Sequence, residues 1–62
     1  MNEKDALKAL EAFHAEWKAR PKRDRPTFKL AVFREKRELF AKLRRKPAIL
    51  TGLPQDMQDD WK

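Results

Sequence analysis

The chain contains no cysteine, serine or tyrosine, and it has one glycine and one histidine among 62 residues. Without cysteine it forms neither a disulfide nor a thiolate zinc site, and one histidine does not make a metal cluster. No serine, cysteine or tyrosine is present to act as a nucleophile, so we expect a non-enzymatic protein that uses no cofactor. Side-chain packing alone must therefore hold the fold.

Long apolar runs are also missing. No segment approaches the roughly 18 apolar residues of a membrane helix, and the N-terminal sequence MNEKDALK lacks the apolar stretch of a signal peptide. Together with the lack of cysteine, this predicts a cytoplasmic protein with no membrane partner. Docking of an amphipathic helix on a membrane surface is the weaker alternative, because internal packing can use up the apolar face.

Charge, in contrast, is abundant and segregated. Charged residues make up 42% of the chain, and the formal net charge is +6. Residues 17–46 carry a net charge of +10, whereas residues 1–16 and 47–62 each carry −2. A basic block between two mildly acidic ends indicates an anionic partner.

The first stretch has the apolar spacing of a helix. Leu10, Phe13 and Trp17 fall on one face of a helix over about residues 3–19, and Pro21 ends it. Residues 20–26 then form an exposed loop, which is too long for the turn of a helix-turn-helix DNA reader.

The central stretch, Thr27 to Lys46, holds most of the large apolar residues. A helix over about 27–46 accounts for six apolar positions, whereas a strand over 27–33 accounts for three, so we expect the helix. On a helical wheel its apolar residues fall into two seams, which either meet different partners or form one broad face. The first seam comprises Phe28, Val32, Leu39 and Leu43, and the second comprises Phe33 and Phe40.

The C-terminal stretch predicts a short third helix. Gly52 is expected to take a positive φ in a turn, and a helix over about 54–61 would lay Met57 and Trp61 back onto the core. The sequence therefore predicts a single all-α domain over 1–62, an antiparallel helical hairpin with a short C-terminal helix packing back. The core is thin enough that homodimerisation could complete it.

The basic block is the main functional signal. Arginine offers planar, forked donors that suit phosphate, so we expect a nucleic-acid-binding accessory or regulatory protein that contacts mainly the backbone of DNA or RNA. The sequence does not say which nucleic acid. The expected contacts are Lys18, Arg20, Lys22, Arg23, Arg25, Arg34, Arg37, Arg44 and Arg45.

A protein partner is the alternative. A basic helical protein of this size is a plausible product of a phage or other mobile element, and such elements often encode regulators and host-directed binders. As an adaptor or inhibitor, this module would bind an acidic surface of its partner. Its interface would depend on apolar anchors, for which we nominate Phe33, Phe40 and Trp61.

The remaining polar residues have simpler interpretations. His14 lies beside the apolar stripe of the first helix and is expected to be structural. Asp56, Asp59 and Asp60 are expected to form a solvated helix end or a counter-charge to the basic block, which they could screen until a partner displaces them.

Overall fold

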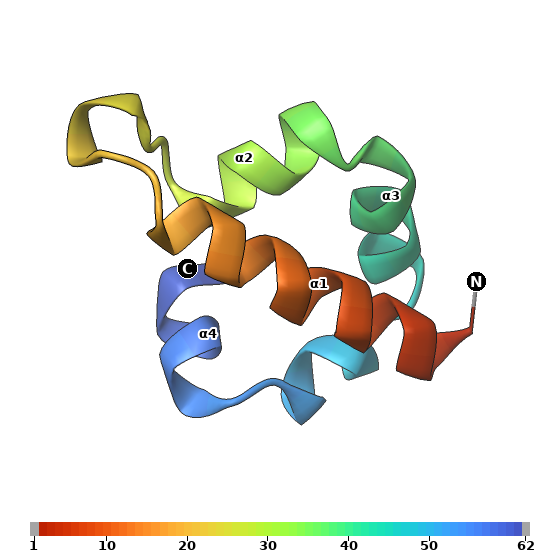
Figure 1. The fold of residues 1–62 in the computed structure, drawn as a ribbon. Helices are drawn as coiled ribbons and strands as arrows, with labels where there is room; N and C mark the ends of the chain where they lie inside the picture. The colour runs from red at the N-terminus through yellow and green to blue at the C-terminus, as the bar shows by residue number, and fades with distance from the viewer. Residues whose placement is uncertain (1, 62) are drawn as a thin grey trace.

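The computed structural model describes residues 2–61, and all the regular structure in this range is helical, which confirms the all-α class. Figure 1 shows α1 crossing the molecule between two groups of elements, with α2 and α3 on one side and η2 and α4 on the other. The chain turns back after α1, so that α1 and α2 form the expected antiparallel hairpin. The α-helices are α1 (Glu3–Lys18), α2 (Phe28–Glu35), α3 (Arg37–Arg45) and α4 (Gln55–Trp61), and the 3-10 helices are η1 (Lys22–Asp24) and η2 (Pro47–Gly52).

The first helix forms as its sequence predicts. The Asn2 side chain accepts a hydrogen bond from the Asp5 backbone N–H at 2.8 Å, which satisfies one of the free donors in the first turn. Leu10, Phe13 and Trp17 are buried along one face. None of the helices within residues 2–61 has the length and apolar character needed to cross a bilayer.

The expected continuous helix over 27–46 is wrong, because the chain breaks at Lys36. That residue has φ −129° and ψ 59°, outside the helical region. Its N–H donates to the Val32 carbonyl at 2.8 Å and ends α2, while its carbonyl accepts from the Phe40 N–H at 2.9 Å and starts α3. A straight helix of this length would run about 30 Å and extend beyond α1. The break allows both α2 and α3 to pack on α1.

The two seams differ in burial. Phe28, Val32, Leu39 and Leu43 are all buried, whereas Phe40 is half-buried and Phe33 is exposed. Phe40 of the second seam meets the C-terminal helix, with its ring centroid 6.1 Å from that of Trp61. Trp61 also contacts Phe28 of the first seam at 5.9 Å, so α4 touches both seams.

Phe28 lies at the centre of an aromatic cluster that joins three helices. It is fully buried, and its ring contacts Phe13, His14 and Trp17 of α1 as well as Trp61 of α4, with centroids 4.8–6.0 Å apart. Such tilted and edge-on aromatic pairs contribute stability beyond the area that they bury.

The connection from α3 to α4 differs from expectation in one respect. Met57 is buried, which confirms that the last helix docks on the core. The positive φ expected for Gly52 is wrong, since no glycine or other residue within residues 2–61 has one. Gly52 is the last residue of η2, and this 3-10 helix replaces the expected irregular turn.

Candidate nucleic-acid interface

Arg20, one of the nominated cations, makes contacts that stabilise the fold. Its guanidinium donates two hydrogen bonds to the Glu35 carboxylate, at 2.7 and 2.6 Å, and lies 5.7 Å from the centre of the Phe13 ring. These hydrogen bonds lower the pKa of Glu35 and raise the pKa of Arg20. A forked, two-bond pair of this kind ties the end of α1 to the end of α2 and leaves little of Arg20 for phosphate.

The loop between α1 and α2 folds back on α1 in the same way. Arg25 donates to the Lys18 carbonyl at 3.1 Å and lies 5.1 Å from the centre of the Trp17 ring, while Trp17 Nε1 donates to the Pro26 carbonyl at 2.7 Å. Lys18 Nζ lies 3.5 Å from the Asp56 carboxylate. These contacts partly neutralise Lys18 and occupy Arg25 internally.

The other nominated cations are exposed, and within residues 2–61 none of them forms an ion pair with a carboxylate. They lie on three separate parts of the surface. Lys22 and Arg23 are in η1 at the tip of the loop. Arg45 lines a hollow with Glu38 and Lys42 on one flank of α3. The remaining group comprises Arg34, Arg37 and Arg44.

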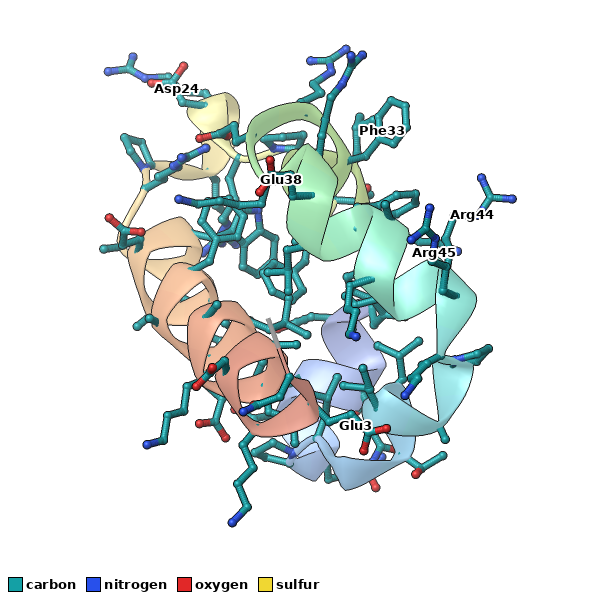
Figure 2. All side chains as sticks on the ribbon, turned by 90° about the vertical axis from the view of Figure 1, so that its right-hand side faces the viewer. Glu3, Asp24, Phe33, Glu38, Arg44 and Arg45 are labelled. Atoms are coloured by element: carbon teal, nitrogen blue, oxygen red, sulfur yellow. The ribbon has the colours of Figure 1, made fainter. Side chains whose placement is uncertain are left out.

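This last group surrounds an exposed apolar patch. Leu30 and Phe33 are 39% and 42% exposed, and they line a shallow groove of about 280 Å³ with Phe40 and Lys29. In Figure 2, Phe33 of α2 and Arg44 of α3 both point outward on the right of the view. We call this area the Phe33 surface, and its members are Lys29, Leu30, Phe33, Arg34, Arg37, Phe40 and Arg44.

The geometry of the Phe33 surface is well defined. The Phe33 and Phe40 rings meet edge to face at 5.1 Å, and the Arg37 guanidinium lies 5.5 Å from the centre of the Phe33 ring. Arg37 and Arg44 are three and four residues from Phe40, so both lie beside it on the face of α3. The members of this surface include four cations and no acid.

A second groove carries charges of both signs. It encloses about 480 Å³ between α1 and the junction of α2 and α3, with Phe13 and Leu39 in its apolar lining. Its lining carries three acids, Glu16, Glu35 and Glu38, together with two cations, Lys36 and Arg37. The carboxylates outnumber the cations there, so a polyanion is better matched by the Phe33 surface, to which Arg37 also belongs.

Two of the acidic C-terminal residues, Asp56 and Asp60, contact α1, and Asp59 accepts a hydrogen bond from Gln55 within α4. Burial raises the pKa of Asp56, but the hydrogen bond from Lys18 and the charge of Lys18 outweigh it, and the net effect is a lowered pKa. Asp60 lies 2.7 Å from Nε2 of the buried His14. The contacts of Asp56 and Asp60 thus lie at α1, with no contact to a cation of the Phe33 surface. No group of three histidine, cysteine or acidic side chains in the described part of the chain is arranged to hold a metal ion.

The nominated interface residues Phe33, Phe40 and Trp61 do lie together, because Phe40 contacts both of the other rings. Sequence reasoning missed Leu30 as a member of the exposed patch. Its position opposite the buried Phe28 on the α2 wheel was the available signal. Comparison with known protein families, curated proteins and solved structures finds no match to this chain. Any assignment of function therefore rests on the surface chemistry described above.

Proposed function

We propose that the protein is a small, non-enzymatic nucleic-acid-binding accessory or regulatory protein. The observation that carries this proposal is the Phe33 surface, on which Lys29, Arg34, Arg37 and Arg44 face solvent with no acid among them. Of the acids nearest in sequence, Glu35 is paired with Arg20. Glu38 is exposed and lines two other hollows, one with Arg45 and one with Arg37. The net charge of +6 supplies long-range attraction for a polyanion.

Binding would be dominated by the phosphate backbone. Arginine guanidinium groups donate in pairs to phosphate oxygens, and each neutralised phosphate releases condensed counterions. The short helices α2 and α3 meet at the Lys36 break, and they present the cations from two directions around one patch. No zinc finger, glycine-rich phosphate loop or helix-turn-helix spacing is present to read a base sequence, so we expect weak sequence preference.

A protein partner is the second candidate, and a specific observation favours it. Leu30 and Phe33 have about two fifths of their surface exposed to water. Phosphate contacts alone do not explain why two large apolar side chains are exposed there. An adaptor or inhibitor could use these side chains as anchors on an acidic protein surface. Its affinity would then depend on Phe33 and Leu30 more than on salt.

Two charge variants test the proposal. Arg34→Gln with Arg44→Gln removes two cations from the Phe33 surface, and Lys4→Gln with Lys8→Gln removes the same charge from exposed positions of α1. Anisotropy of labelled random duplex DNA and single-stranded RNA would measure affinity. We expect the Arg34→Gln, Arg44→Gln variant to bind at least several-fold more weakly than the Lys4→Gln, Lys8→Gln variant. Equal losses would mean that the net charge, and not this surface, attracts the ligand.

A further inference from the structure

Phe33 is 42% exposed although its ring packs against the half-buried Phe40. Leu30 and Phe33 are the large apolar side chains that stand out as exposed within residues 2–61, whereas the first seam of the same helices is fully buried. An aromatic ring kept in water and surrounded by cations indicates a ligand that combines an apolar, planar group with negative charge.

The ring is also held in a fixed orientation. Phe40 packs edge-on against it, with an angle of 82° between the ring planes, and the Arg37 guanidinium lies over it. Phe40 is itself half-buried against Trp61, so the rigid core supports this arrangement. A ring held between Phe40 and a planar guanidinium in this way forms a stacking platform at a small entropic cost.

Three observations weigh against other occupants of this surface. Two copies meeting face to face would bring Lys29, Arg34, Arg37 and Arg44 against their own counterparts, and such like-charge contacts oppose a dimer. A stable protein interface buries about 800 Å² on each partner. The whole molecule has 4555 Å² of accessible surface, and the large apolar side chains exposed on it within residues 2–61 are Leu30 and Phe33. Two such anchors are few for an interface of that size. A DNA duplex offers phosphates but keeps its base faces stacked inside.

We propose, on the basis of the proposed function, that the Phe33 surface binds single-stranded nucleic acid and that an unpaired base stacks on Phe33. Lys29 lies one turn before Phe33 and Arg34 one turn after Leu30 on α2, and Arg37 and Arg44 flank Phe40 along α3. Both helices therefore place cations at the border of the patch, where they can meet the phosphates that adjoin the stacked base. Every base has an aromatic face, so this site tolerates sequence variation.

The test compares two labelled single strands with the same number of phosphates, an oligothymidine and an abasic strand, at about 50 mM salt. We expect the wild-type protein to bind the oligothymidine about fivefold or more tightly than the abasic strand, the range typical of one base stacked on one aromatic ring. Phe33→Leu should bring the two affinities together. Phe33→Tyr should keep the preference, and so should the matched control Leu30→Ala, which removes an equally exposed apolar side chain without a ring.

The outcomes separate this inference from the proposed function. Equal affinity of the wild-type protein for both strands would overturn base stacking and leave phosphate binding intact. Loss of the preference in Leu30→Ala, or its retention in Phe33→Leu, would likewise overturn the role of the ring. Failure to bind any nucleic acid would overturn both proposals and favour an acidic protein on this surface. Circular dichroism melts of each variant would establish that it is folded.

Discussion

His14 Nε2 lies 2.7 Å from Asp60 Oδ2, and this contact joins the middle of α1 to the last turn of α4. The His14 side chain is only 7% exposed, and its ring also packs against Phe28 and Trp17. A helix of seven residues does not form alone in water. The pair therefore fixes the position of α4 on the core, together with the buried Met57.

Removal of the Asp60 carboxylate should loosen this helix. Asp60→Ala leaves a buried imidazole nitrogen without its partner, which costs about 1–3 kcal/mol of the free energy of unfolding. Urea unfolding followed by tryptophan fluorescence would measure the loss. Asp60→Asn can still form a hydrogen bond to the imidazole and should lose less. If both variants matched the wild-type midpoint, the contact would not stabilise the fold.

The Arg20–Glu35 pair predicts a loss of stability in acid. The hydrogen bonds from Arg20 hold the pKa of Glu35 below its ordinary value of 4.5. A lowered pKa in the folded state means that the ionised carboxylate favours folding, so its contribution is full above about pH 4.5 and disappears as the pH falls through the lower, folded pKa. The nearby charges are Glu16 on α1 and Lys36 at the end of α2.

Denaturant titrations at a series of pH values would check this dependence. Glu35→Gln should show a shallower decline in the free energy of unfolding below pH 4.5 than the wild-type protein. Glu11→Gln changes the charge by the same amount at an exposed position of α1, and it should follow the wild-type curve more closely. Identical slopes for Glu35→Gln and the wild type would contradict the role assigned to the pair.

Phe28 should be the most sensitive position in the core. Phe28→Ala removes the ring that joins α1, α2 and α4 and leaves a cavity, which costs about 3–5 kcal/mol. A domain this small has a total stability of only a few kcal/mol, so we expect the variant to be largely unfolded at 25 °C by circular dichroism. A cooperative melt close to that of the wild type would show that the aromatic cluster is not central.

Gly52 should tolerate a side chain. Its φ is not positive, and a Cβ built there would meet Leu7 Cδ1 at 3.6 Å, an ordinary van der Waals contact. Gly52→Ala should therefore leave stability unchanged or raise it by about 0.4–1 kcal/mol, because alanine reduces the freedom of the unfolded chain. A clear loss in thermal melts would mean that the backbone there needs glycine.

The sequence predicted the helices better than the connections between them. The stripe of Leu10, Phe13 and Trp17 defined α1, because a single amphipathic face determines both the type and the orientation of a helix. The wheel of the central stretch assumed 100° per residue throughout, and this assumption failed at Lys36. No proline or glycine marks that break. It results from the packing of both halves on α1, which a local pattern does not contain.

The candidate site was predicted only in part, for a similar reason. Composition identified the basic block, but it did not show that Arg20 and Arg25 turn inward to Glu35 and Trp17. Nor did it show that Arg45, but not Arg44, lines the hollow with Glu38 and Lys42, since that follows from the orientation of α3 on the core. Phe33 was nominated as an interface residue, and its exposure is consistent with that interpretation.

The most direct measurement is the salt dependence of nucleic-acid binding by the wild-type protein. Anisotropy of labelled single-stranded RNA and random duplex DNA would be recorded at about 50 and 200 mM salt. If the four cations of the Phe33 surface each neutralise a phosphate, affinity should fall about 150-fold for the duplex and about 50-fold for the single strand across that range, and about tenfold if two of them do. Absence of binding at the lower salt, or binding that salt does not weaken, would contradict the proposal that this surface holds a nucleic-acid backbone.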